Sequence, residues 1–376
     1  MTDFAILTTD SAIEALSAEW QELYARVGEE SGLFTDPDSF LIWWRTIGKD
    51  QRTPYVVTGR KEGRLIGVLP LAIARNHGLR ILQAAGYKAL SICEVLCETP
   101  DLVEGLWKAA KQGKGYHFAD IRDVYADSAN HAELSRIARR RDTSKAFSLD
   151  LSPWSDGEAW FRAIPRKMRY ETERKLRKMK NEKGPISFKT YDGFADGPFP
   201  EAIMGDLLRH KLNWCQSHDK DGLFSHPKAC DFFRELARSA AQRGALNLGW
   251  LCCGESTIGY VLNFQRKGIL SGYVTSYDPA WSSCSPGILT LIHAIKWAID
   301  HGKKSYDLNQ GDYQYKQKFS NAEKECAEFT FGANDPLGWL TENLYFQARA
   351  TGRRLREVLK SAKTEQEPHK QESRKS

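Results

Sequence analysis

The sequence predicts a mixed α/β (α+β) fold in which one plan of strands and helices occurs twice, giving two mixed sheets flanked by helices. Three observations predict it. In each half, a strand and two amphipathic helices precede three strands joined by tight turns. Each half then continues with a helix, a strand, a short helix and a last strand. Short apolar runs bounded by turn residues indicate strands, and apolar residues three or four apart indicate helices.

The first half begins with an expected strand over 3–10 and amphipathic helices over 11–28 and 37–48. A Lys-Glu-Gly turn then joins two strands of the meander. The other elements expected in this half are strands over 54–60, 64–75 and 79–86, a helix over 100–113, a strand over 117–124, a helix over 131–141 and a strand over 145–152.

The second half repeats this order, and Gly244 and Gly302 end two of its helices. Its expected elements are a strand over 186–191, helices over 199–215 and 226–244, strands over 246–253, 257–265 and 269–277, a helix over 288–300, a strand over 305–309, a helix over 312–319 and a strand over 326–332. We therefore expect four regions: a first domain over 1–153, a linking helix over 154–184, a second domain over 185–340, and a basic C-terminal helix with a disordered tail over 341–376.

The composition indicates a cytoplasmic globular protein. Apolar residues make up 41% of the 376 residues and charged residues 27%. The opening stretch lacks the basic and apolar regions of a secretory signal, and no apolar run of about 18 residues is present. The eight cysteines have no zinc or redox spacing, so we expect buried free thiols and no metal.

The net charge of +6 comes from one stretch, residues 166–183, which holds nine Lys or Arg and three Glu. Its apolar residues fall at helical spacing, which predicts an amphipathic helix with a broad basic face. Such a helix is either a solvated surface or a clamp for an anionic substrate. Aromatic residues are not interleaved along it, which argues against sequence-specific nucleic-acid binding.

Several residues that favour turns lie directly before the apolar helix expected to begin at Ile288. Among them, Ser285, Pro286 and Gly287 form a helix start suited to an anion, because such a start presents unpaired N–H groups and partial positive charge. Pro286 pre-sets the helical dihedral, Gly287 permits close approach, and Ser285 can cap the helix or bond an oxygen. The alternative is plain capping at a turn. We expect a pyrophosphate site.

Several stretches resemble the CelD/BioF2-like acyltransferase family, which is associated with bacterial exopolysaccharide and cellulose loci and related to the FemAB peptidyl transferases. The order of elements is also that of the GNAT (N-acetyltransferase) fold. The stretches are RHKLNW (209–214), IGYVLNFQ (258–265), GYVTSYDPAWSSCSPGILTLIHAI (272–295), YDLNQGDYQYKQKF (306–319), FTDPDSFLIWWRTIG (34–48) and GRLIGVLPLAIA (63–74). The resemblance implies a tandem GNAT fold.

The resemblance further implies an acyl-CoA co-substrate, acetyl-CoA or another, bound at the second half. It assigns Val274, Thr275 and Asn309 to the cofactor site together with the Ser-Pro-Gly helix start. The site departs from the common phosphate loop of the fold, which has more glycines. In the first half, Glu94, Glu98 and Asp101 stand at the equivalent place and would repel a pyrophosphate. That half is therefore expected to complete the acceptor cleft without binding the cofactor.

The catalytic candidates follow the fifth strand of the second half. Asp312 is the first candidate for the general base, Tyr315 for the acid, and Lys316 for stabilising the oxyanion or an acceptor phosphate. Each has a structural alternative, since Asp312 would be a good N-cap, Tyr315 a core residue and Lys316 a surface charge.

The substrate-binding candidates lie on two helices and one strand end. The expected set is His210, Lys211, Trp214, Tyr277 and Asp278, together with Arg169 and Arg177 of the basic helix. Trp214 suits stacking on a sugar ring, although a core tryptophan is the common alternative. Arg169 and Arg177, with Lys175, are expected to bind a phosphate or diphosphate of the acceptor.

The expected function is acyl-CoA-dependent N-acylation of an amino sugar or similar amine, in free, nucleotide-linked or lipid-linked form, in polysaccharide synthesis. Peripheral association with a membrane polysaccharide-synthesis complex, on the inner face, is part of this expectation. Two alternatives stay open. One is FemAB-like transfer from aminoacyl-tRNA to a peptidoglycan precursor, and the other is a catalytically silent scaffold or ligand sensor.

Overall fold

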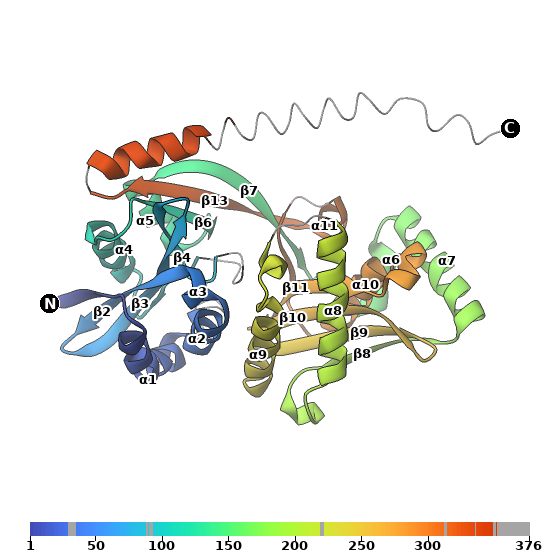
Figure 1. Ribbon diagram of the computed structural model, residues 1–376. Helices are drawn as coiled ribbons and strands as arrows, with labels where there is room; N and C mark the ends of the chain where they lie inside the picture. Colours follow the sequence, from blue (N-terminus) through green and yellow to red (C-terminus); the bar gives the residue numbers. More distant parts are fainter. Residues whose placement is uncertain are drawn as a thin grey trace.

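The computed structural model describes residues 1–28, 35–87, 89, 93–218, 222–311, 314–334, 336–348 and 351. Both halves follow the expected order of elements (Figure 1). The first half comprises β1 (Thr2–Leu7), α1 (Asp10–Val27), α2 (Pro37–Trp43), the π-helical turn η2 (Trp44–Gly48), α3 (Lys49–Gln51), β2 (Arg52–Lys61), β3 (Arg64–Asn76), β4 (Leu79–Ala84), β5 (Leu96–Cys97), α4 (Leu102–Gln112), β6 (Phe118–Tyr125), α5 (Ala129–Ile137) and β7 (Arg139–Asp150).

The second half begins with two helices that the first half lacks. It comprises α6 (Gly157–Ala163), α7 (Arg166–Lys183), β8 (Ile186–Tyr191), η3 (Phe194–Asp196), α8 (Glu201–Ser217), η4 (Leu223–Ser225), α9 (Ala229–Gln242), β9 (Leu246–Cys253), β10 (Ser256–Arg266), β11 (Ile269–Tyr277), η5 (Pro279–Cys284), α10 (Pro286–Asp300), β12 (Ser305–Gln310), α11 (Gln314–Phe319) and β13 (Ala322–Gly332). A further helix runs over 336–348.

The sheets of the two halves are joined into one sheet of 13 strands. Its order is β1-β2-β3-β4-β6-β13-β7-β12-β11-β10-β9-β8, with β5 paired to β3 beside this path. The last strand of each half is therefore exchanged, because β13 pairs with β6 of the first half and β7 pairs with β12 of the second. The two exchanged strands also pair with each other, antiparallel.

Some elements differ from their sequence predictions. The linking helix expected over 154–184 consists of two helices, α6 and α7, with Pro165 between them. The helix expected over 131–141 ends at Ile137, and the arginines that follow belong to β7. Arg139 and Arg140 pair with Thr330 and Phe329 of β13. Pairing with a strand made much later in the chain thus overrides the helical preference of the local sequence.

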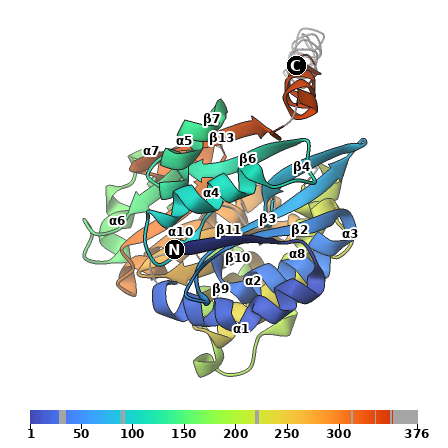
Figure 2. The same ribbon diagram turned by 90° about the vertical axis from the view of Figure 1, so that its left-hand side faces the viewer.

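Helices cover both faces of the sheet. In the first half, α1 and α2 lie on one face and α4 and α5 on the other (Figure 2). In the second half, α10 packs against β9, β10 and β11. A β-carbon added at Gly259 of β10 would lie 2.1 Å from the Thr290 hydroxyl, so α10 approaches the sheet closely because that residue is glycine.

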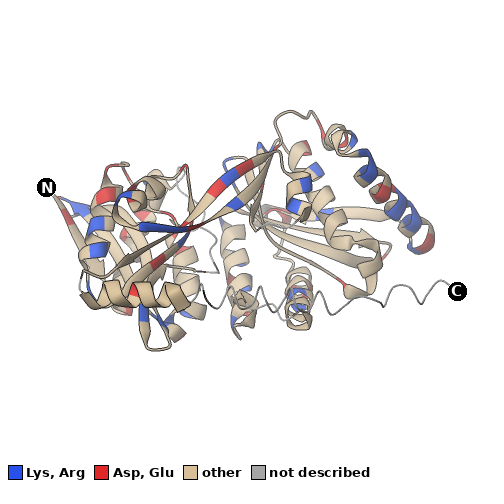
Figure 3. Cartoon of the chain, turned by 90° about the horizontal axis from the view of Figure 1, so that it is seen from above, with Lys and Arg blue, Asp and Glu red and all other residues tan. Residues whose placement is uncertain are grey.

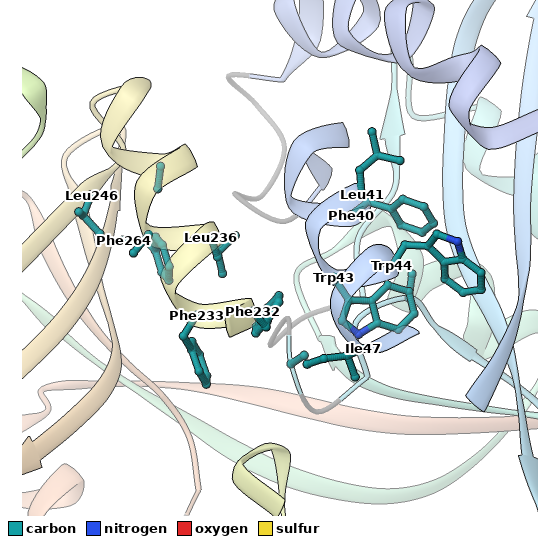
Figure 4. Packing of buried hydrophobic residues seen from close by; sticks show 14 of the residues in the cluster. Phe40, Leu41, Trp43, Trp44, Ile47, Phe232, Phe233, Leu236, Leu246 and Phe264 are labelled. Atoms are coloured by element: carbon teal, nitrogen blue, oxygen red, sulfur yellow. The ribbon is translucent and has the colours of Figure 1, made fainter. Parts of the chain in front are cut away.

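The two halves also pack through their helices. Phe40, Trp43 and Ile47 of the first half belong to the same buried cluster as Phe232 and Leu236 of α9 (Figure 4). Ion pairs cross the same contact, between Arg243 and Asp36 (2.5 Å) and between Lys228 and Asp50 (2.8 Å). The contact between α2 and α9 therefore fixes the position of α9, which also borders the site described below.

The basic helix α7 lies at the outer end of the second half, away from the first half (Figures 1 and 3). Its buried residue Met179 packs with Leu251, Ile258 and Leu289. The sequence analysis expected this helix at the junction of the two halves. The helix connects the halves along the chain, but it does not lie between them in space. Among the described residues, no helix is both long and apolar enough to cross a membrane.

Candidate active site

The candidate site opens where two parallel strands of the second half diverge. β11 and β12 pair only through Ile269, Leu270 and Ser271, which face Ser305, Tyr306 and Asp307. From Gly272 onward β11 runs on apart from β12. The Asn309 side chain bridges the start of this wedge by donating to the Gly272 carbonyl oxygen at 2.7 Å. A register shift against β10 at Tyr273 adds a bulge there.

A cavity of about 1210 Å³ fills this wedge. The residues that line it come from α8, η4, α9, β11, η5, α10, β12 and α11. They are Lys211, Asn213, Trp214, Ser217, His218, Leu223, Phe224, Phe233, Gly272, Tyr273, Val274, Thr275, Ser276, Tyr277, Pro279, Ser282, Ser285, Pro286, Gly287, Ile288, Leu291, Leu308, Asn309, Gln310, Tyr315 and Lys316. The six predicted cofactor residues all line this one cavity.

The start of α10 has an unusual backbone at Ser285. This residue is left-handed (φ 56°), and it turns the chain from η5 directly into α10. Its hydroxyl makes no capping hydrogen bond to the helix. Because Pro286 has no N–H, Gly287 is the first residue of the helix that offers one to a ligand. The sequence left two roles open for the Ser285 side chain, capping the helix or bonding an oxygen of a ligand. Side-chain capping is not observed.

Lys175 of α7 reaches this helix start. Its ammonium donates to the Ser285 hydroxyl at 2.7 Å. The sequence expected Lys175 in the acceptor cleft with Arg169 and Arg177, and no local signal links it to a serine 110 residues away. The contact adds a positive charge to the N-terminus of α10, which already favours anions.

Gly287 is not required by the protein's own packing. Its backbone is in an ordinary helical conformation, and an added β-carbon would lie 3.5 Å from the Tyr277 ring, an ordinary contact. The absence of a long side chain, rather than a strained turn, is therefore what this glycine provides at the first N–H of α10, which lines the cavity. That is the arrangement that a phosphate needs in order to approach a helix start.

Lys316 is the most buried charged residue among those described in the cavity wall, with 6% of its surface exposed. Its ammonium donates to the carbonyl oxygens of Asn309 (3.3 Å) and Gln310. Burial lowers the pKa of Lys316 to about 8, although nearby Asp307 opposes this shift. The surface-charge alternative does not apply, and an ammonium in this position can stabilise negative charge in the cavity.

The other two catalytic candidates are placed differently. Tyr315 lines the cavity and is partly buried against the core under α10. Asp312 lies outside the described residues. Its role as a base therefore remains a prediction.

The predicted acceptor residues divide into two groups. Lys211, Trp214 and Tyr277 line the cavity, with the Lys211 ammonium 4.8 Å from the centre of the Trp214 ring. Burial lowers the pKa of Lys211. His210 and Asp278 are not among the lining residues. His210 is buried and stacks on Tyr260, and Asp278 caps η5 through the Ala280 N–H at 3.0 Å.

Arg169 and Arg177 lie on α7, outside the cavity lining. Arg169 donates to the carbonyl oxygen of Arg162, and Arg177 is exposed. Phosphate binding by this pair remains a prediction.

Several lining residues were missed by sequence reasoning. The His218 ring stacks on the Trp214 ring, with 4.6 Å between the two ring centres. The two residues are four positions apart at the end of one helix, so the sequence could have indicated that they share a face. Tyr273 alternates along β11 with Thr275 and Tyr277, which were both predicted, so this spacing could also have indicated it. Phe224, Phe233 and Gln310 carried no such signal, because only the tertiary fold brings them to the cavity.

The first half has a similar wedge, since β4 and β6 pair only at Ile81–Phe118 and Leu82–Ala119. Glu98, one of the carboxylates expected to repel a cofactor there, is held by Arg26 (3.1 Å) and Arg64 (2.8 Å). In the described part of the chain, no three His, Cys, Asp or Glu side chains are grouped as a metal site.

Comparisons with known proteins agree with this geometry. Residues 166–317 match the family model of the acetyltransferase (GNAT) domain. The structure is similar to FemX (TM-score 0.55, 10% identity, 90% of this chain and 99% of that chain). It is also similar to a conserved protein of unknown function from Bacteroides thetaiotaomicron (TM-score 0.51, 11% identity, 88% of this chain and 99% of that chain). No curated protein gives a significant match.

The matched region holds the cavity, the α10 start and the wedge between β11 and β12. The chain has the tandem GNAT fold, as the sequence predicted, and the GNAT domain indicates an enzyme of the N-acetyltransferase type. Proteins of this fold generally use acetyl-CoA.

Proposed function

We propose that the protein is an acyl-CoA-dependent N-acyltransferase that acts on an amino sugar or a similar amine. The observation that carries the proposal is the cavity itself. It joins an anion-binding helix start, reinforced by Lys175, to an aromatic wall around Trp214. One ligand with a pyrophosphate and one with a ring would occupy its two ends.

The residues of the α10 end fit acyl-CoA. The first N–H of α10, the Ser285 hydroxyl and the Lys175 ammonium would hold the pyrophosphate. The stretch Gly272–Tyr277 of β11, which has no pairing with β12, would offer backbone groups to the extended arm of the cofactor. Among the cavity-lining residues that are described, none is Asp or Glu, so nothing there repels the phosphates.

Bound acyl-CoA would supply a thioester, whose C–S bond breaks as the amine nitrogen forms the new C–N bond. The chain's own residues have three tasks. Lys316 would stabilise the negative charge on the carbonyl oxygen. Tyr315 would give a proton to the leaving thiolate, and the proton of the amine must pass to a base, for which Asp312 is the sequence candidate.

The opposite wall suits an acceptor with a ring and an anionic substituent. Trp214, His218 and Phe224 offer ring faces, and carbohydrate rings stack on such faces. Lys211, which is partly buried, places its ammonium over the Trp214 ring. A nucleotide- or lipid-linked amino sugar, of the kind used in exopolysaccharide synthesis, has both features. The resemblance to CelD/BioF2-like proteins supports the same assignment.

Titration calorimetry with acetyl-CoA and longer acyl-CoAs tests the proposal. Binding at micromolar concentration is expected, and the absence of binding to any of them would refute it. Transfer from charged tRNA without acyl-CoA activity would favour the aminoacyl-transfer alternative instead.

Replacing Lys175 with Gln is expected to weaken acetyl-CoA binding about tenfold, because a charge-assisted contact to phosphate is worth about 1.5 kcal/mol. Arg177→Gln is the matched control, since it removes the same charge from an exposed position of the same helix. Equal effects of the two substitutions in calorimetry would mean that α7 acts only as a diffuse basic surface.

A further inference from the structure

The helix over 336–348, called the C-terminal helix below, lies on the outside of the first half (Figures 1 and 2). A buried polar contact fixes its orientation. The Glu342 carboxylate accepts hydrogen bonds from the Arg141 guanidinium of β7 and from the Thr330 hydroxyl of β13, both at 2.8 Å. Because a buried carboxylate needs these partners, the contact determines which face of the helix meets the sheet.

The same face of the helix carries two aromatic rings. Tyr345 and Phe346 pack on Phe118 of β6, with 4.9 and 5.9 Å between the ring centres. The start of the helix is also close to the sheet, since a β-carbon added at Gly338 would lie 2.8 Å from the His117 carbonyl oxygen. The C-terminal helix therefore cannot turn about its axis without breaking these contacts.

The opposite face of the C-terminal helix is apolar and exposed. Leu337, Leu340 and Leu344 follow one another at spacings of three and four residues, so they form one stripe. These leucines are 56%, 46% and 56% exposed, and Trp339 beside them is 57% exposed. In the described part of the chain nine large apolar side chains are exposed, and this one short helix carries four of them. Such a concentration marks an interaction surface.

The charges around this face are positive. The only charged residue of the C-terminal helix is Glu342, which is buried, so the exposed side of the helix presents no carboxylate. Arg139 lies beside the helix, where it donates to the Asn343 side chain at 3.0 Å, and it forms no ion pair with a described carboxylate. The chain then continues into a basic stretch, because residues 349–363 contain six Lys or Arg and one Glu. An apolar stripe flanked by positive charge is complementary to a bilayer that contains anionic lipids.

We propose that the C-terminal helix docks the protein on an anionic lipid bilayer, lying along its surface with Leu337, Leu340 and Leu344 inserted among the acyl chains. Trp339 suits the level of the headgroups, where an indole ring meets apolar surroundings and its N–H meets polar groups. The basic stretch adds attraction to the lipid phosphates, and surface binding of this kind depends on both contributions. The proposal concerns the place where the protein acts and does not depend on the proposed reaction.

A second copy of the chain fits this face less well. Four half-exposed side chains present roughly a few hundred Å², whereas a stable interface buries about 800 Å² on each partner. Two copies that met through this helix would also bring their basic stretches together, and like charges repel. A bilayer accepts an apolar stripe of this size, and its negative charge attracts the basic residues.

Sedimentation of the full-length protein with large vesicles tests the proposal. Vesicles of about two parts phosphatidylcholine to one part phosphatidylglycerol should bind the protein, and pure phosphatidylcholine should bind it about tenfold more weakly or less, because the electrostatic attraction is lost. Replacing both Leu340 and Leu344 with Ser should lower the partition coefficient on the anionic vesicles about tenfold or more, since two apolar side chains no longer leave water.

The matched control is Phe194→Ser combined with Ile269→Ser. It removes two exposed apolar side chains from other places on the molecule and should leave vesicle binding unchanged. Circular dichroism and thermal unfolding of each variant show that it is folded.

Tryptophan fluorescence provides a second measurement that does not rely on a loss of binding. Addition of the anionic vesicles should shift the emission to shorter wavelength, because Trp339 moves from water to the interface. Trp339→Phe should remove this shift while the protein still sediments with the vesicles, since phenylalanine keeps the face apolar. A shift that persists in Trp339→Phe would place the contact elsewhere and contradict the proposal.

The other outcomes are equally distinct. If the variant of Leu340 and Leu344 binds the anionic vesicles as well as the wild type does, another surface makes the contact, such as the basic helix α7, and the proposal is wrong. It is also wrong if the wild type binds no vesicles. In that case, a dimer seen by light scattering and dissociated by the same variant would show that a second copy covers the face. Calorimetry with acetyl-CoA is independent of all these results, so the proposed function is judged separately.

Discussion

Replacement of Gly287 by glutamate is expected to abolish measurable acetyl-CoA binding. The new carboxylate would stand at the first free N–H of α10, where the pyrophosphate is proposed to lie. Like charges a few ångströms apart in a partly buried site repel by about 3 kcal/mol or more, which is roughly a 100-fold loss of affinity. Calorimetry of both proteins under the same salt conditions measures it.

Gly287→Ala is the control for this prediction. Its methyl group would meet the Tyr277 ring at 3.5 Å, a contact that the protein accommodates. Only a small loss of affinity is therefore expected, since the helix start stays accessible. If alanine and glutamate weakened binding equally, steric exclusion rather than charge would explain the site. If neither did, the pyrophosphate does not bind at α10.

Of the substitutions discussed, Arg243→Ala is expected to lower the free energy of unfolding the most, by about 3 kcal/mol. Arg243 pairs with Asp36, whose side chain is completely buried, and with Asp38 at 3.1 Å. Removing the arginine leaves the Asp36 carboxylate buried with only its hydrogen bonds to Ser39 and to the Asp38 N–H among the described residues. Because this pair crosses the contact between α2 and α9, the loss should loosen the two halves.

The loss should depend on pH. Burial raises the pKa of Asp36, and Arg243 is the main group opposing that shift. Without Arg243 the pKa rises further, so the folded state binds a proton that the unfolded chain has lost. The destabilisation should therefore be smallest near pH 4 and grow toward pH 7. Urea unfolding at both pH values tests this.

A double variant separates the charge from the contact. Asp36→Ser with Arg243→Ala keeps an N-cap for α2, which Asp36 now supplies through the Ser39 N–H. It should be more stable at pH 7 than Arg243→Ala alone, because no buried charge is left unpaired. A double variant as unstable as the single one would assign the effect to lost packing.

The order of elements and the cofactor end of the site could be predicted because their signals are local. Periodicity located β8 and β9, and the Ser285-Pro286-Gly287 turn before an apolar helix indicated an anion site. Each of these features depends on residues that are neighbours in the chain. The amino-acid sequence of each segment therefore contains the information that predicts it.

Features that depend on distant pairing could not be predicted. The strand exchange leaves the alternation of apolar residues in β7 and β13 unchanged, so nothing in either strand distinguishes the two pairings. Lys175 reaches the site only through the tertiary fold. The position of α7 was wrongly expected between the halves, because order along the chain was taken as order in space.

The strand exchange also has a consequence for biosynthesis. On the ribosome, β6 is made long before its partner β13, which begins at Ala322. At about 5–20 residues per second, the delay is on the order of ten to forty seconds. During that time β6 and β7 expose unpaired edges, which are prone to aggregate. The first half can complete its sheet only when almost the whole second half has emerged, so a late truncation would damage the part of the protein that was made first.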